Sequence, residues 1–277
     1  MKTSLRSIIG TAGAVLLFGW LAAPACADIL YLPNSGNNTI EKFTPDGVRS
    51  VFASSEMRNP IGVVFDSAGN LFVVDDRDNT IWKYTPDGVG SVFASGSHGL
   101  VGLAFDSAGN LYAANSRNNT IEKYTPGGVG SVFASGGLLK RPIGIAFDSA
   151  GNLYAANWSR DTNGKNTIVK FTPSGTGSVF ADSGLSFPYG LAFDSAGNLY
   201  AANNPIDTIE KFTPDGVDSV FASGGLSNPE FLAFTDDFGV PLLQPGGRLV
   251  PEPSTWALLG LGLPALLGLP RPRRRAR

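Results

Sequence analysis

One seven-residue phrase, Phe-Asp-Ser-Ala-Gly-Asn-Leu, occurs four times in this 277-residue chain, beginning at Phe65, Phe105, Phe147 and Phe193. A second phrase, Thr-Ile-x-Lys-Phe/Tyr-Thr-Pro, occurs five times, with its isoleucine at positions 40, 81, 121, 168 and 209. The isoleucines are therefore 40 to 47 residues apart. A period of this length, built from short strand patterns, predicts the blades of a β-propeller rather than a helical solenoid.

Each repeat contains four short strand patterns separated by turn signals. In one copy, apolar segments at 102–106 and 111–114 flank the sequence Ser-Ala-Gly-Asn, and those at 120–125 and 130–134 flank Pro-Gly-Gly. Gly and Pro favour tight turns, and the Asp that precedes each first turn is suited to accept hydrogen bonds from the turn backbone. The repeat therefore predicts four antiparallel strands per blade, with the repeated Asp and Gly residues acting as turn formers.

The two ends of the repeat region are incomplete in complementary ways. Residues 30–32, 39–44 and 50–53 supply three strands, and residues 230–235 supply a single one. Pairing of these four strands would close the ring and remove its exposed sheet edges. We therefore expect an all-β propeller of about five four-stranded blades over residues 28–240, closed by both ends of the chain.

These repeats resemble NHL repeats, which form propellers, and the resemblance spans about residues 28–240. It implies the fold and says little about function. Six blades are the commoner number in that family, whereas this sequence supplies five. A degenerate apolar segment at 238–243 leaves the choice between five and six blades open.

Residues 1–27 have the pattern of a Sec signal peptide. Two basic residues precede an apolar run at 8–21, and Ala-Cys-Ala at 25–27 is a small-x-small cleavage site. We therefore expect the Sec machinery to export the chain. The alternative is a lipoprotein in which Cys26, the one cysteine of the sequence, is acylated.

The last segment, residues 250–277, combines three features in order: Pro251-Glu252-Pro253, an apolar stretch at 257–269, and five arginines from 271 onward. This arrangement, which follows a linker at 241–249, resembles the PEP-CTERM sorting signal. The resemblance implies a short transmembrane helix, recognition by an exosortase in the inner membrane of a Gram-negative bacterium, and release to the cell surface or the extracellular space. A plain tail anchor is the alternative, which an apolar core of about 14 residues would make weak because a stable span needs about 20.

Charge excludes one class of partner. Residues 28–250 contain 14 of the 21 lysines and arginines and 22 of the 23 acidic residues, for a net charge of −8. Nucleic-acid binding needs a basic surface. We therefore expect no nucleic-acid partner.

The loops after the second and fourth strands of each blade share one face, and they vary while the tight turns on the other face do not. Variable loops on a rigid scaffold commonly carry function. Polar residues recur directly after the second strands, and we expect them to form a ligand-binding ring at the channel mouth: Asn34, Asp75, Asn115, Asn157 and Asn203. The alternative is that each side chain satisfies the hydrogen bonds of its own loop.

One blade carries a five-residue insertion within residues 157–164, where Trp158 follows the strand. An exposed Trp flanked by Arg and Asn side chains suits stacking against a sugar, whereas neutral drift is the alternative explanation. Other loop residues differ between blades and are expected to contribute to the same face: Arg141, Phe187, Tyr189, Asn228 and Glu230.

Two classes of function remain. The first is an exported, non-catalytic propeller that binds a glycan or protein, or acts as a scaffold, in an extracellular polysaccharide matrix without any cofactor. PEP-CTERM proteins are commonly associated with exopolysaccharide-producing bacteria, so that resemblance favours it. The second is a lactonase-like or lyase-like enzyme, because NHL-like propellers resemble gluconolactonase-type and virginiamycin B lyase-type proteins, which use a divalent metal; Ca²⁺ would be the candidate here. One histidine, His98, and one ring carboxylate, Asp75, with its neighbour Asp76, are a sparse set for such chemistry, so the first class is favoured.

Overall fold

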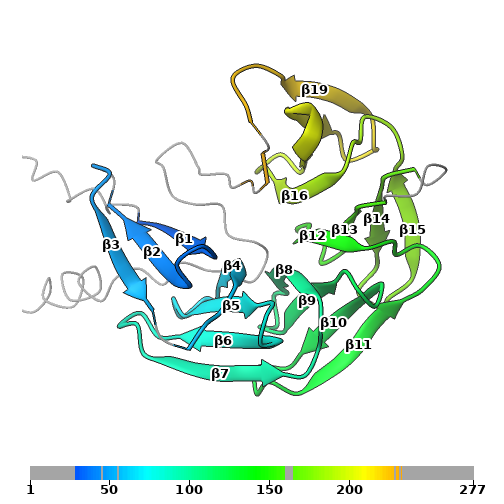
Figure 1. The fold of residues 1–277 in the computed structure, drawn as a ribbon. Helices are drawn as coiled ribbons and strands as arrows, with labels where there is room; N and C mark the ends of the chain where they lie inside the picture. The colour runs from blue at the N-terminus through cyan, green and yellow to red at the C-terminus, as the bar shows by residue number, and fades with distance from the viewer. Residues whose placement is uncertain are drawn as a thin grey trace, which may run out of the picture.

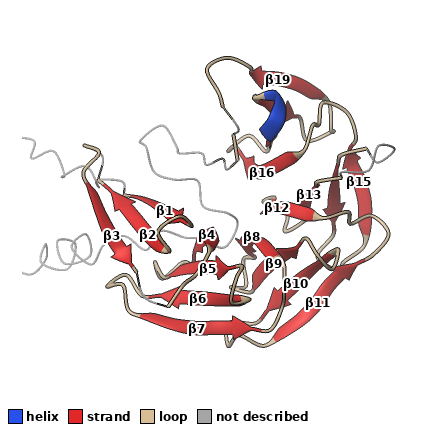
Figure 2. Ribbon diagram, viewed as in Figure 1, coloured by secondary structure: helices blue, strands red, loops and turns tan. Residues whose placement is uncertain are grey.

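The computed structural model describes residues 29–44, 46–54, 56–159, 165–227, 229, 230 and 232. In this part of the chain, nineteen strands form five antiparallel sheets, which are arranged as blades around a central axis (Figure 1). The one helix drawn in Figure 2 is the three-residue 3-10 helix η1 (Asn204–Ile206). The prediction of an all-β, five-bladed propeller is therefore confirmed.

The blades follow one another in chain order. The first contains β1 (Leu30–Asn34), β2 (Thr39–Phe43) and β3 (Arg49–Ala53), and the second β4 (Pro60–Phe65), β5 (Leu71–Asp75), β6 (Thr80–Tyr84) and β7 (Gly90–Ser95). The third contains β8 (Leu100–Phe105), β9 (Leu111–Asn115), β10 (Thr120–Tyr124) and β11 (Gly130–Ser135). The fourth contains β12 (Pro142–Phe147), β13 (Leu153–Asn157), β14 (Thr167–Phe171) and β15 (Gly177–Ala181), and the fifth β16 (Pro188–Phe193), β17 (Leu199–Asn203), β18 (Thr208–Phe212) and β19 (Asp218–Ala222).

The expected closing strand at 230–235 lies mostly outside the described residues. Leu232, however, lines the cavity on the axis together with the innermost strands β4, β8, β12 and β16. The predicted signal peptide (1–27), linker (241–249) and sorting signal (250–277) also lie outside the described residues. Within the described residues, no helix has the length and hydropathy needed to span a membrane.

The repeated Asp residues act as turn formers, as predicted. Asp106 Oδ1 accepts hydrogen bonds from the backbone N–H groups of Ala108 (3.0 Å) and Asn110 (2.8 Å). Gly109 between them has a φ of +79°, which glycine adopts without the steric cost that a side chain would add. The same hydrogen bonds recur at Asp66, Asp148 and Asp194.

Neighbouring blades pack through repeated aromatic trios. Tyr112 of the third blade contacts Phe133 of its own blade at 5.1 Å and Phe147 of the next blade at 4.9 Å between ring centroids, both edge to face. This geometry suits aromatic pairs and adds to the stabilisation from burial. In the fifth blade Tyr200 contacts Phe221 at 5.0 Å, and Phe221 is 58% exposed.

Glycines bring the innermost strands into backbone contact. A Cβ atom on Gly62 would lie 2.0 Å from the carbonyl oxygen of Val101 in the next blade. The corresponding distances are 2.3 Å from Gly102 to the Ile143 carbonyl oxygen and 2.0 Å from Gly144 to the Tyr189 carbonyl oxygen. Real Cβ atoms do not approach backbone this closely, so these positions require glycine.

We expect Gly144→Ala to lower the free energy of unfolding by about 1–3 kcal/mol, because the added methyl group forces two blades apart. The change corresponds to several degrees of melting temperature, measured by circular dichroism, for a domain of this size. The matched control is Gly127→Ala, since Gly127 lies in an exposed turn where the nearest atom is 3.9 Å from the built Cβ. Equal melting temperatures for the two variants would contradict the packing argument.

Candidate functional site

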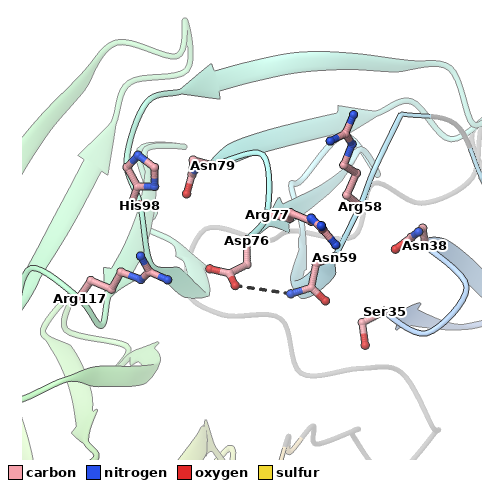
Figure 3. Close-up of a pocket in the computed structure, with 9 residues that line it drawn as sticks. All are labelled: Ser35, Asn38, Arg58, Asn59, Asp76, Arg77, Asn79, His98 and Arg117. Carbon is pink, nitrogen blue, oxygen red and sulfur yellow. Dashed lines mark hydrogen bonds between the residues drawn. The ribbon is translucent and has the colours of Figure 1, made fainter.

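Two adjoining cavities open on the face that carries the variable loops. The first, which we name the arginine groove, has a volume of about 740 Å³ and is shown in Figure 3. Its lining residues are Ser35, Asn38, Arg58, Asn59, Asp76, Arg77, Asn79, His98 and Arg117. The second, which we name the aromatic mouth, has a volume of about 440 Å³ and shares Asp76 and Arg117 with the groove. Its walls include Ile61, Val101, Arg141, Ile143, Trp158 and Tyr189.

The basic residues of the groove come from matching positions of successive repeats. Arg58 and His98 each lie four residues before an axial glycine, and Arg77 and Arg117 each lie two residues after the end of a second strand. Sequence reasoning missed the three arginines. The signal for them is present in the sequence: when the repeats are aligned by their axial glycines, basic residues occupy equivalent positions in successive repeats.

Positive charge in the groove exceeds negative charge. Arg58 Nε lies 3.5 Å from Asp78 Oδ2, and the two side chains are 67% and 36% exposed. Asp76 accepts a hydrogen bond of 3.5 Å from Asn59 Nδ2, drawn as the dashed line in Figure 3. Among the residues that the structure describes, Arg77 and Arg117 form no ion pair. The groove is therefore a local positive region in an acidic domain.

Packing holds Arg117 in place at the border of the two cavities. Its aliphatic stem lies so close to Gly99 that a Cβ atom there would be 2.5 Å from Arg117 Cγ. The Gly99 carbonyl oxygen in turn accepts hydrogen bonds from the backbone N–H of Ser116 (2.8 Å) and from its hydroxyl (3.1 Å). The loop that carries Arg117 is thus fixed to the loop before β8.

The aromatic mouth surrounds one end of the axial cavity. Its residues Ile61, Val101, Ile143 and Tyr189 directly precede the axial glycines of four blades. The centroids of the Trp158 and Tyr189 rings are 6.4 Å apart. The Arg141 guanidinium lies 4.5 Å from the centroid of the Trp158 ring. Trp158 is half-buried, not exposed as expected, because Arg141 covers part of it. The remaining insertion residues, 160–164, lie outside the described residues.

Two loop residues beside the mouth have a left-handed backbone. Arg141 has a φ of +51° and Phe187 a φ of +47°, and each directly precedes a proline. Bulky residues rarely adopt this conformation, and such strain concentrates at functional sites. At Arg141 the conformation is held by its N–H, which donates to Asn119 Oδ1 at 2.7 Å, and by its carbonyl, which accepts from the Trp158 N–H at 3.2 Å.

The expected polar ring lies beneath the surface rather than at the channel mouth. The side chains of Asp75, Asn115, Asn157 and Asn203 are fully buried, and Asn34 is half-buried. Asp75, Asn157 and Asn203 accept hydrogen bonds from backbone N–H groups of the neighbouring loops, and the Asn115 side chain bonds to Glu122 and to the Asn118 N–H. We therefore correct the expectation: these residues form the framework under the loop face, and they do not reach a ligand in this arrangement.

Asp75 and Asn157 show how this framework acts. Asp75 accepts hydrogen bonds from the backbone N–H groups of Arg58 (2.8 Å) and Asn59 (3.1 Å), which belong to the groove. Asn157 accepts from the Lys140 N–H (2.9 Å) and donates to the Leu138 carbonyl oxygen (2.7 Å) and to Thr167 Oγ1 (2.8 Å). Each side chain thus ties the loop before the first strand to the end of the second.

Asn115 belongs to a different buried network. Its Nδ2 donates to Glu122 Oε1 at 2.7 Å, and the Tyr124 hydroxyl donates to Glu122 Oε2 at 2.6 Å. Burial, followed by the hydrogen bond to Glu122, raises the pKa of Tyr124 well above its ordinary value. The phenol therefore stays a hydrogen-bond donor throughout the physiological pH range.

The axial cavity is small and apolar. Its volume is about 160 Å³, and it is lined by four glycines and by aliphatic residues such as Val63, Leu103, Ile145 and Leu191. Within the described ranges, no three His, Cys, Asp or Glu side chains form a group that could hold a metal ion.

Solved structures share this fold, whereas no protein-family model and no curated protein sequence matches the chain. A chain in the crystal structure of a nidogen–laminin complex superposes with a TM-score of 0.65 at 21% identity, covering 75% of this chain and 81% of that one. Virginiamycin B lyase from Staphylococcus aureus gives 0.63 at 18% identity, with 75% and 71% covered. A gluconolactonase from Xanthomonas campestris gives 0.63 at 15% identity, with 76% of each chain covered. These comparisons show the fold, a β-propeller, which is shared by enzymes and by a component of a protein complex.

We expect Asn157→Ala to destabilise the protein by about 2–4 kcal/mol, because the buried Asn157 amide makes three hydrogen bonds, to Lys140, Leu138 and Thr167, that alanine cannot make. The matched control is Asn118→Ala, whose side chain is exposed. Urea unfolding followed by fluorescence measures both. A loss at Asn157 no larger than at Asn118 would argue against the framework role.

Proposed function

We propose that this protein is an exported, non-catalytic propeller that binds a glycan on its loop face, as a binding or scaffold module at the cell surface or in an extracellular polysaccharide matrix. The observation that carries the proposal is the open site formed by the arginine groove and the aromatic mouth. Aromatic rings beside hydrogen-bonding side chains suit sugar rings, which present both apolar faces and hydroxyl groups. A protein ligand is the competing occupant of the same face.

The export part of the proposal rests on the sequence. The Sec-type leader at 1–27 and the segment at 250–277 with Pro251, Glu252 and Pro253 support passage through the inner membrane, where an exosortase would be a transient partner. The acidic balance of residues 28–250 supports the absence of a nucleic-acid partner.

A metal-dependent lactonase or lyase is the second candidate, since proteins with those names share the fold. Hard divalent cations prefer several oxygen ligands, whereas glycines and aliphatic side chains line the axial cavity. We therefore propose that the protein needs no cofactor.

We expect Trp158→Ala to weaken glycan binding about tenfold, because it removes the aromatic wall of the mouth. Trp158→Phe, which keeps an aromatic ring, should retain most of the affinity. Screening the full chain on a glycan array, followed by calorimetry on the hits, measures both variants. The absence of any bound glycan, or equal binding by the alanine variant, would count against the proposal.

We expect the melting temperature of the full chain to be the same in EDTA and in millimolar Ca²⁺. A cation present at 100 times its Kd would add about 2.7 kcal/mol, or several degrees for this domain. A Ca²⁺-dependent rise would instead favour the enzyme candidate, which lactonase assays would then test directly.

A further inference from the structure

We infer that the arginine groove binds the carboxylate groups of an acidic polysaccharide, a polyuronate chain, through Arg58, Arg77 and Arg117. The inference rests on the proposed function, because it names the chemical class of glycan for the same face. It goes beyond that proposal in assigning the charged groups that select the ligand.

The first observation is uncompensated charge. Three arginines and one aspartate line the groove, while the surrounding domain is acidic. Arg77 and Arg117 are exposed and, among the described residues, take part in no ion pair. A guanidinium group presents a planar fork that matches a carboxylate with two parallel hydrogen bonds. Arg58 is already paired with Asp78, so carboxylates placed along a chain would give Arg77 and Arg117 the partner that they lack among the described residues.

The second observation is the presence of neutral hydrogen-bonding groups among the arginines. Ser35, Asn59 and Asn79 line the same groove, and Asp76 lies in it between Arg117 and Asn59 (Figure 3). Hydroxyl and amide groups suit the hydroxyls of a sugar, and the Asp76 carboxylate is an acceptor for them. The same carboxylate repels a densely charged backbone such as that of a nucleic acid. The mixture therefore favours a sugar chain with spaced acidic groups.

The third observation is continuity. The groove and the aromatic mouth share Asp76 and Arg117, so one extended ligand can contact the arginines and then the Trp158 and Tyr189 rings. The aliphatic stem of Arg117 packs against Gly99 at the junction, which restricts the range of positions that its guanidinium can take. Preorganised side chains lose less entropy on binding, which suits a built site better than an incidental cluster of surface charges.

The test is calorimetry of the full chain with oligogalacturonate and, as a neutral probe of equal length, oligogalactan. The key variant is Arg77→Gln with Arg117→Gln, and both residues are exposed, so folding should be preserved. The matched control is Lys42→Gln, which removes a positive charge from strand β2 outside the groove. We expect the double variant to weaken oligogalacturonate binding by about 10- to 100-fold, with Lys42→Gln near wild type. Raising the ionic strength should weaken the wild type far more than the double variant.

Other outcomes overturn the inference and separate it from the proposed function. Binding of oligogalactan that Trp158→Ala removes, without binding of oligogalacturonate, would leave the proposed function standing and refute the polyuronate site. Oligogalacturonate binding unchanged by the double variant would refute the role of the arginines. Equal or tighter binding of polyphosphate or single-stranded DNA would show a general polyanion site. The single variants Arg77→Gln and Arg117→Gln, each checked by its melting temperature, guard against an unfolded double variant.

Discussion

Close approach of backbone at the propeller axis is the constraint on which the rest of the structure depends. At Gly62, Gly102 and Gly144 the innermost strands come so near to the next blade that no side chain fits between them. The second to fifth blades are therefore packed tightly against one another around the axis, and the aromatic trios at larger radius pack in a repeated geometry. In the four blades whose innermost strand the structure describes, the residue before the axial glycine lies at the same end of the axial cavity, and these residues form part of the walls of the aromatic mouth.

The same ring turns differences between repeats into a localised site. Buried side chains such as Asp75 and Asn157 fix the loops of each blade to the strand ends below them. Once the loops are fixed, basic residues from the second and third blades converge on one groove, while the fourth blade contributes Arg141 and Trp158 to the mouth. A domain with an acidic overall charge thereby presents a basic groove in one place, so the charge of this groove differs from the net charge of the domain.

The repeat made much of this architecture predictable. The Phe-Asp-Ser-Ala-Gly-Asn-Leu phrase predicted the first turn of each blade because Asp and Gly have local backbone roles, and the strands that follow were placed within one or two residues. The polar ring was expected at the channel mouth because sequence position shows that these residues lie at the ends of the second strands. It does not show that four of the five side chains are buried. Burial depends on the loop that folds over each residue, as the loop before β12 does over Asn157. The groove was missed because its arginines come from different loops, each of which by itself looks like an ordinary solvated turn.

The sequence by itself determined the repeat, the four-strand pattern of a blade and its turns, because these follow from local periodicity and from the backbone preferences of Gly, Pro and Asp. The choice between five and six blades was left to the tertiary structure, whose described residues form five sheets. Only the tertiary structure decided which side chains are buried and which meet, since contacts between residues tens of positions apart arise from closing the blades around an axis. Arg77 and Arg117 are 40 positions apart in the chain and line one groove because two blades stand side by side. The chemistry of the loop face therefore depends on how neighbouring blades pack, whereas the blades themselves follow from the repeated sequence.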